Sequence, residues 1–282
     1  MAARAALVAG LALTLAGCAP EPSAPTPEPV REQQTLRLQE EPAFARLFEE
    51  AGVTGTLVVL DPARSRVLVH DSVRARERFL PASTFKVANA LVALETGAVA
   101  DTLKRFIWDG TEREIAPWNR DHTLATAFEN SVVWAFQDVA RRIGEGEMER
   151  RLLTFDYGNA DIGGGIDRFW LTGDLRISAL EQVRFLRRLR ERQLPVSERT
   201  ATLVEGIMRE GRSGEATLHA KTGWADLDAL DPERTDLGWY VGFVAREEGV
   251  VYFALNLDLE RPDQAPLRRS IALQALADLG LY

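Results

Sequence analysis

A serine and a lysine stand three residues apart in the stretch Ser83-Thr84-Phe85-Lys86. The mostly apolar residues that follow predict a helix, on which positions i and i+3 share one face. Ser83 would lie in the first turn, where unpaired amides and the helix dipole favour developing negative charge. A serine hydroxyl becomes a good nucleophile only when a base takes its proton, and a lysine can be that base only when it is uncharged. The pair predicts a nucleophile beside a buried lysine, although this spacing alone is common by chance.

Two short motifs further along the chain support that interpretation. Ser131 begins the triplet Ser-Val-Val at the expected start of a helix, and Lys221 begins the triplet Lys-Thr-Gly at the end of an expected strand. A serine–lysine pair, a second serine and a Lys-Thr-Gly strand, in this order, are the three elements of the penicillin-recognising serine enzymes. The order of the motifs makes the joint signal much stronger than any one of them.

The residues within the motifs show which class of these serine enzymes the chain resembles. The second element is Ser-Val-Val, whereas class A enzymes have Ser-Asp-Asn there. The chain also contains Tyr-Gly-Asn at 157–159 and Phe-Trp-Leu at 169–171. Together with Ser-Thr-Phe-Lys at 83–86, these motifs resemble the class D β-lactamases, the oxacillinases. The stretches GGIDRFWL, LRISALEQVRFL and PLRRSI are also similar to that family, so the resemblance covers essentially the whole folded part.

This resemblance implies an activity and a set of catalytic residues. The chain would be a serine β-lactamase that hydrolyses the β-lactam amide of penicillins and related antibiotics, and so confers resistance. Ser83 would carry the acyl-enzyme. Lys86 would be carboxylated by carbon dioxide or bicarbonate, with no other cofactor, and this N6-carboxylysine would be the general base for acylation and deacylation. Trp170 would hydrogen-bond the carbamate, and Ser131 would relay a proton towards the β-lactam nitrogen.

The resemblance also implies a set of residues that bind the substrate. Arg268 would bind the substrate carboxylate, and the backbone N–H groups of Ser83 and Trp224 would form the oxyanion hole. Trp224 stands where a Phe is frequent in the family, a departure that keeps the backbone donor but can alter the shape of the cleft. Tyr157 belongs to an element that is mainly architectural in the family, so we do not assign it to catalysis. The residues implied to contact the substrate are Lys221, Thr222, Gly223, Trp224, Arg268, Val133 and Leu171.

The apolar residues of these motifs explain how a lysine could be uncharged. Phe85, Val133, Trp170 and Leu171 would surround Lys86. Burial among apolar groups disfavours the ammonium and lowers the pKa of the amine. A neutral amine can attack carbon dioxide, and the product is an anion beside the serine that it must deprotonate.

The elements that must position these residues follow from the hydrophobic pattern. A hairpin, a helix from Ser83 to about Glu95 with a stop at Gly97, a helical block, three strands and a closing helix are expected in that order. This order predicts an α+β, three-layer α/β/α fold of the β-lactamase/penicillin-binding transpeptidase type. Its antiparallel sheet comes from both chain ends, is flanked by helices and carries an inserted all-helical subdomain. The ranges outside the Ser83 helix are 55–71, 100–215, 218–225, 238–246, 250–260 and 266–280.

The N-terminal residues have the pattern of a secretory signal. A short segment with Arg4 precedes an apolar run that ends in Leu-Ala-Gly-Cys, which resembles a bacterial lipobox with Cys18 as the lipidated residue. We therefore expect a lipoprotein signal peptide at 1–17, the lipidated cysteine and a disordered Pro-rich tether at 18–35, and the β-lactamase domain at 36–282. The expected location is the periplasm, anchored by lipid to a bacterial membrane, with the outer membrane favoured.

The composition excludes several classes of partner. The chain has 46% hydrophobic and 27% charged residues, as in ordinary globular proteins, and a net charge of −8, which argues against a nucleic-acid partner. The histidines His70, His122 and His219 are scattered and give no zinc spacing, so no metal site is expected. The expected partners are β-lactam antibiotics and a membrane. The sequence leaves monomer and homodimer open.

Two other functions share these motifs. A penicillin sensor has the same fold and the same three elements but is acylated once and stops. A D,D-peptidase uses them on cell-wall peptides. Sensor domains normally adjoin a transmembrane signalling segment, whereas this sequence shows only a lipid-type signal, which favours an enzyme. The Ser-Val-Val element together with Trp170 favours a lactamase over a peptidase.

Overall fold

The computed structural model describes Met1 and residues 37–227, 231, 233 and 235–282. The expected signal peptide, Cys18 and the expected tether lie outside the described residues, apart from Met1. Residue contacts place Leu36–Tyr282 in one compact unit. No helix in the described part is both long enough and apolar enough to cross a membrane.

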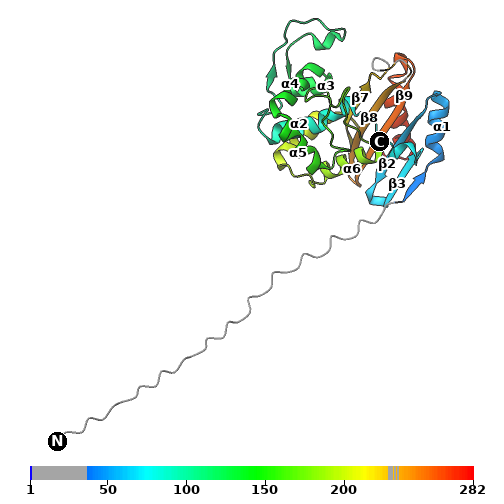
Figure 1. The fold of residues 1–282 in the computed structure, drawn as a ribbon. Coiled ribbons are helices and arrows are strands. Elements are labelled where there is room, and N and C mark those ends of the chain that lie inside the picture. Colours follow the sequence, from blue (N-terminus) through cyan, green and yellow to red (C-terminus); the bar gives the residue numbers. More distant parts are fainter. Residues whose placement is uncertain (2–36, 228–230, 232, 234) are drawn as a thin grey trace. The chain divides into compact units, whose positions relative to one another are not determined.

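A mixed sheet forms the centre of this unit (Figure 1). Over the described residues it has seven strands in the order β1-β3-β2-β9-β8-β7-β6, and a separate short pair is β4-β5. Both ends of the chain meet at the pairing of β2 with β9, as the sequence predicted. The strands are β1 (Leu38–Glu40), β2 (Gly55–Asp61), β3 (Arg66–His70), β4 (Arg105–Phe106), β5 (His122–Thr123), β6 (Arg209–Ser213), β7 (Ala216–Ala225), β8 (Asp236–Arg246) and β9 (Gly249–Leu259).

Helices cover both faces of the sheet, which gives the three layers (Figure 1). Side chains alternate along a strand, so Leu57 and Val59 join the core under α1 and α8, while Val58 and Leu60 join the core under the helical block. The α+β layering predicted from the sequence is therefore confirmed. The helices are α1 (Pro42–Ala51), α2 (Lys86–Glu95), α3 (Leu124–Glu129), α4 (Val133–Ile143), α5 (Glu145–Phe155), α6 (Ala179–Arg190), α7 (Glu198–Met208) and α8 (Leu267–Asp278).

Two features of the sheet differ from the expectation. The strand β1 pairs in parallel with β3, so the sheet is not wholly antiparallel. The edge strands β1 and β6 are short, and their residues are almost all exposed or half-buried, so their sequences lack the apolar alternation that signals a strand. Charged, short edge strands are common because they discourage edge-to-edge pairing between molecules.

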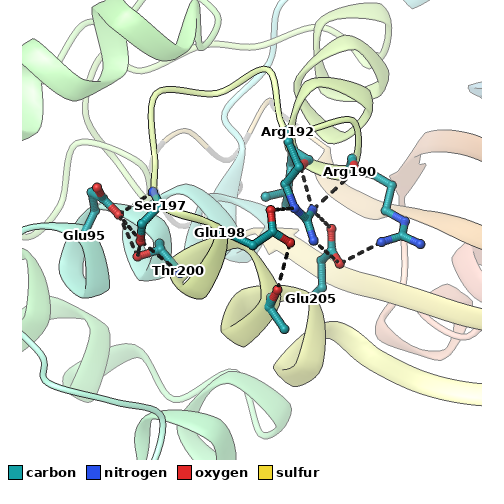
Figure 2. Close-up of polar contacts among 9 residues, drawn as sticks. Glu95, Arg190, Arg192, Ser197, Glu198, Thr200 and Glu205 are labelled. Carbon is teal, nitrogen blue, oxygen red and sulfur yellow. Dashed lines mark hydrogen bonds and ion pairs between the residues drawn. The ribbon is translucent and has the colours of Figure 1, made fainter.

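A cluster of charged side chains holds the joint between α6 and α7, by which we mean the connecting residues 191–197 and the helix ends beside them (Figure 2). The nearly buried carboxylate of Glu205 accepts hydrogen bonds from Arg192 and, at 3.1 Å, from Arg190. The backbone carbonyl of Glu205 accepts a 2.8 Å hydrogen bond from Nδ1 of His219 on β7. Side chains two apart on a strand point the same way, so this bond ties α7 to the face of β7 that carries Lys221.

The same joint is anchored to the end of α2 (Figure 2). The Glu95 carboxylate accepts hydrogen bonds from the Ser197 backbone N–H at 2.9 Å and from the Thr200 hydroxyl at 2.7 Å. Ser197 also caps α7, because its side chain accepts from the Thr200 N–H. The helix that begins with Lys86 is therefore held at its far end by the joint that also contacts β7.

Candidate active site

Ser83 lies in a tight turn that leads directly into α2. The turn is a 3-10 helix, Ala82–Phe85, and Lys86 is the first residue of α2. Lys86 Nζ lies 2.7 Å from Ser83 Oγ, within hydrogen-bonding distance. Ser83 is 8% exposed and Lys86 is wholly buried, so the serine can be reached from the surface while the lysine cannot.

Neighbouring segments hold this turn in place. The Ala82 N–H donates to the Trp170 carbonyl at 3.0 Å, and the Trp239 indole N–H on β8 donates to the Leu80 carbonyl at 2.9 Å. A Cβ on Gly223 would lie 3.1 Å from the Pro81 carbonyl, so β7 approaches the turn closely at this glycine. The position of the serine thus depends on contacts with the sheet and with the Trp170 loop.

The surroundings of Lys86 disfavour its charged form. Burial lowers the pKa of the amine well below its ordinary range, and the positive charge of Lys221 lowers it further. The Phe136 ring lies 5.5 Å from Nζ. Phe85 stacks on Trp170, with ring centroids 5.2 Å apart. The predicted neutral lysine beside the serine is therefore the state that this site favours.

Trp170 presents an unused hydrogen-bond donor. Its side chain is fully buried, yet the indole Nε1 has no hydrogen-bond partner among the described residues. A buried polar group without a partner is rare and costly, and a catalytic role is one explanation for it. The Trp170 backbone carbonyl accepts a hydrogen bond from the nucleophile turn, and the Trp170 ring stacks on Phe85. A carboxylated Lys86 would bring acceptor oxygens to this region, so the residues present fit that modification.

Ser131 occupies a strained position between two helices. Its φ is +55°, in the left-handed region. The Ser131 N–H donates to the Phe128 carbonyl at 3.1 Å, and the Val132 N–H donates to the Ala127 carbonyl at 2.8 Å. These two bonds form a Schellman motif at the end of α3, with Ser131 at the position that glycine usually occupies. The sequence predicted that Ser131 stands at a helix start, and α4 does begin two residues later.

The segment that carries Ser131 reaches both lysines of the site. Phe128, before the serine, has its ring 5.5 Å from Lys221 Nζ. Phe136, after the serine, has its ring at the same distance from Lys86 Nζ. Ser131 therefore lies on the connection between two aromatic rings that contact the two amines.

The Lys-Thr-Gly motif lies within β7 rather than at its end. Lys221 is buried, and burial together with the charge of Arg268 lowers its pKa to about 7, while Glu210 opposes this effect. Its Nζ donates to the Thr222 carbonyl at 3.1 Å. Thr222 is half-buried, and its hydroxyl lies 3.4 Å from Lys221 Nζ.

Arg268 and Trp224 form the edge of the site. The Arg268 side chain donates to the Gly223 carbonyl and, at 2.7 Å, to the Ala265 carbonyl. A Cβ on Gly238 would lie 2.5 Å from Arg268 Cδ, so this glycine makes room for the arginine. Burial lowers the pKa of Arg268 to about 10, and it stays charged at neutral pH. Its guanidinium lies 5.7 Å from the Trp224 ring centroid.

Comparison with known proteins identifies the family of this site. The profile described as "Penicillin binding protein transpeptidase domain" matches residues 55–277. β-Lactamase OXA-48 of Klebsiella pneumoniae is 42% identical over 238 residues, which cover 84% of this chain and 88% of that protein. β-Lactamase OXA-10 of Pseudomonas aeruginosa is 36% identical over 244 residues, which cover 86% and 91%.

Solved structures show the same likeness. The class D β-lactamase YbXI from Nostoc superposes with a TM-score of 0.81 at 39% identity, over 85% of this chain and 99% of that one. The class D β-lactamase FUS-1 (OXA-85) of Fusobacterium nucleatum gives a TM-score of 0.82 at 34% identity, over 86% and 99%. The chain belongs to the class D β-lactamases. Enzymes of this class are metal-independent serine hydrolases, and no cluster of metal-binding side chains occurs among the described residues.

Contacts among the described residues link Ser83 and Lys86 with Trp170, Lys221 and Arg268. The residues of the class D motifs lie on several elements. The residues are Ser83 and Lys86 at the start of α2, Ser131 and Val133 at the start of α4, Trp170 and Leu171 in the loop before α6, Lys221, Thr222, Gly223 and Trp224 on β7, and Arg268 on α8. Their individual roles stay predictions.

Sequence reasoning missed three residues that shape this class D site. Phe128 and Phe136 face the two amines, and Gln182 on α6 donates at 2.8 Å to the Thr84 hydroxyl inside the nucleophile turn. Phe136 had a signal, because it lies three residues after Val133 on the same helix face. Gln182 had none, since a polar residue on an amphipathic helix is usually expected to face solvent.

The left-handed backbone at Ser131 gives a prediction about stability. A side chain with a Cβ costs roughly 1 kcal/mol in this conformation, whereas glycine adopts it freely. Ser131→Gly should therefore raise the melting temperature by about 2–4 °C. Ser131→Ala removes the same hydroxyl but keeps the Cβ, so it should give no such gain. Calorimetry of the three proteins checks this, and equal melting of the glycine and alanine variants would contradict it.

Proposed function

We propose that this chain hydrolyses the β-lactam amide of penicillins and related antibiotics through an acyl-enzyme on Ser83. The observation that carries the proposal is the wholly buried amine of Lys86, 2.7 Å from the Ser83 hydroxyl and in surroundings that favour its neutral form. Membership of the class D β-lactamases supplies the substrate class, because the relatives are named as β-lactamases.

Acylation requires a base, an oxyanion site and an acid. A base at Lys86 takes the proton from Ser83 Oγ as Oγ bonds to the lactam carbonyl carbon. The N–H groups of Ser83 and Trp224 would hold the developing oxyanion. The carbon–nitrogen bond then breaks, and Ser131 would deliver the proton that the departing nitrogen takes up. Carboxylation of Lys86 by carbon dioxide would make the base an anion.

Deacylation reuses the same groups. The base at Lys86 takes a proton from a water molecule, which attacks the ester carbonyl. The bond from that carbonyl carbon to Ser83 Oγ breaks, and the oxygen regains a proton. Trp170 would orient the base through its unpaired indole N–H. A sensor that is acylated and stops would lack this second half of the cycle.

Substrate binding would depend on the cationic edge of the site. Arg268 would hold the substrate carboxylate, because charge-assisted hydrogen bonds to a carboxylate are stronger than neutral ones. Lys221 and Thr222 would add further donors beside it, while Gly223, Val133 and Leu171 would shape the walls. The Arg268 side chain contacts both the Gly223 carbonyl and the Trp224 ring, which supports its place at this edge.

Turnover of a chromogenic cephalosporin tests the proposal. The wild type should complete many turnovers, and Ser83→Ala should lose several powers of ten, because no other nucleophile is placed to form the acyl-enzyme. Mass spectrometry after brief exposure to penicillin should find the adduct on the Ser83 peptide. Ser270→Ala, at an exposed serine on α8, is the matched control and should keep full activity. A single stoichiometric burst would instead identify a sensor.

The depressed pKa of Lys86 predicts how activity depends on pH. The amine is neutral above its lowered pKa and gains a proton as the pH falls through it. Carboxylation needs the neutral amine, so activity should fall at acid pH and added bicarbonate should restore it. Trp170→Phe keeps a ring but removes the N–H, and should make activity more dependent on bicarbonate.

Carbon-13 NMR with labelled bicarbonate measures this directly. The wild type should show a carbamate resonance, and Trp170→Phe a weaker one at the same bicarbonate concentration. Lys86→Ala has no amine to carboxylate and should stay inactive at every bicarbonate concentration. A fully active enzyme with no carbamate resonance would mean that Lys86 acts as a plain amine.

We also propose that the mature chain begins at a lipidated Cys18 and is anchored on the periplasmic side of a bacterial membrane, with the outer membrane favoured. The support is the sequence Leu-Ala-Gly-Cys at the end of the apolar run. Several acyl chains are needed for stable anchoring, as one binds only marginally. Cys18→Ser should move the protein into the soluble periplasmic fraction. The proposal fails if the wild type already fractionates there.

A further inference from the structure

Two tryptophans link an outer loop to the turn that carries Ser131. The Trp118 indole N–H donates to the Asn130 carbonyl at 3.0 Å. The Trp134 indole N–H, on the first turn of α4, donates to the Trp118 carbonyl at the same distance. The Asn130 carbonyl belongs to the peptide group that joins Asn130 to Ser131. Trp118 therefore holds the peptide plane immediately before Ser131.

That carbonyl needs a partner from outside the helix. The last carbonyls of a helix have no partner within it, and Asn130 is the cap of α3. The Schellman bonds of Ser131 and Val132 satisfy the carbonyls of Phe128 and Ala127 only. The bond from Trp118 fills the acceptor that the motif leaves open.

The direction of the Ser131 side chain relative to this peptide plane is set by φ of Ser131. The plane turns about ψ of Asn130, which is 5°, and φ of Ser131, which is +55°. An L residue prefers negative φ by roughly 1–2 kcal/mol, so an unrestrained plane would tend to rotate. If φ of Ser131 changed relative to a plane held on α3, its hydroxyl would point in another direction. A hydrogen bond on the carbonyl opposes this change.

The loop that supplies Trp118 is itself held rigidly. Nε2 of His122 donates to the Pro117 carbonyl at 2.9 Å, and the His122 ring packs edge-on against Trp134. The Arg113 guanidinium also lies over Trp134, 5.6 Å from the ring centroid. A donor on a well-anchored loop can impose a geometry on its acceptor.

We propose that Trp118 is a positioning residue for Ser131, and that its indole N–H fixes the peptide plane that sets the Ser131 hydroxyl for proton delivery. This inference rests on the proposed function, in which Ser131 serves the departing nitrogen. That nitrogen departs only during acylation. Loss of the Trp118 N–H should consequently slow acylation and spare deacylation.

The sharpest variant replaces Trp118 by benzothienylalanine, which keeps the bicyclic ring and puts sulfur in place of the N–H. Any contact of the ring with substrate is preserved. The acylation rate, measured by single-turnover stopped flow with a chromogenic cephalosporin, should fall about tenfold, the effect of one net hydrogen bond. The deacylation rate, measured by intact-protein mass spectrometry after quenching, should not change. Trp118→Phe is the second variant if the first does not fold.

Trp108 offers a matched control on the same loop. Its indole N–H also donates to a backbone carbonyl, that of Thr111, at 2.9 Å, but this bond does not touch the Ser131 turn. Benzothienylalanine at 108, or Trp108→Phe, should leave both rates unchanged. If the substitutions at 108 and at 118 slow acylation equally, the effect is a general one on the loop and the inference is wrong.

The same Trp118 substitution made in a Ser131→Ala protein shows whether the slower acylation depends on Ser131. In Ser131→Ala the hydroxyl is absent, so the change at Trp118 should slow acylation no further. Equal slowing in both backgrounds would mean that Trp118 acts elsewhere, and no slowing in the wild-type background would also overturn the inference. If Ser131→Ala itself acylates normally, the proposed role of Ser131 fails and this inference fails with it. That result is distinct from the others.

Discussion

The Lys86 amine lies in the interior of the protein, 2.7 Å from the Ser83 hydroxyl, and no carboxylate among the described residues pairs with it. An unpaired ammonium is expensive to bury, so the site favours the neutral amine that a base requires. The surroundings come from separate segments: the Phe136 ring from α4 and, through stacking on Phe85, Trp170 from the loop before α6. Because no single segment can bury this side chain, the chemistry depends on docking of the helical block onto the sheet.

Backbone strain accompanies that burial. Ala82, beside the nucleophile, has a φ of +47°, and Ser131 has a φ of +55°. Residues in the left-handed region persist only where their surroundings determine the backbone, and such residues cluster at functional sites. Here the restraints are bonds from outside each turn, from Ala82 to the Trp170 carbonyl and from Trp118 to the Asn130 carbonyl. The site therefore uses stability from the rest of the fold to keep two side chains in place.

Local patterns predicted most of the fold. The hairpin of β2 and β3 and the strands β7 to β9 have apolar runs bounded by turn residues, and Gly97 ends α2 with a φ of +75°. The edge strands lacked such a pattern and were missed. The site followed from the three motifs, whose residues are chemically distinctive. The rings of Phe128 and Phe136 were missed because they act through packing, which depends on how α3 and α4 dock and not on the spacing of polar residues.

The three basic side chains Arg268, Lys221 and Lys86 influence one another's pKa in that order. The charge of Arg268 lowers the pKa of Lys221, and the charge of Lys221 lowers that of Lys86, each in addition to burial. A cation that disfavours an ammonium at Lys86 favours an anion at the same place, because the sign of the interaction reverses. Lys221 would thus promote both the loss of a proton from Lys86 and the retention of a negative group built on it. Arg268, bonded to the Gly223 carbonyl, keeps its own charge at the edge where an anionic substrate would arrive. The positive charge of the site would therefore stabilise an anionic base in the interior and attract an anionic substrate at the rim.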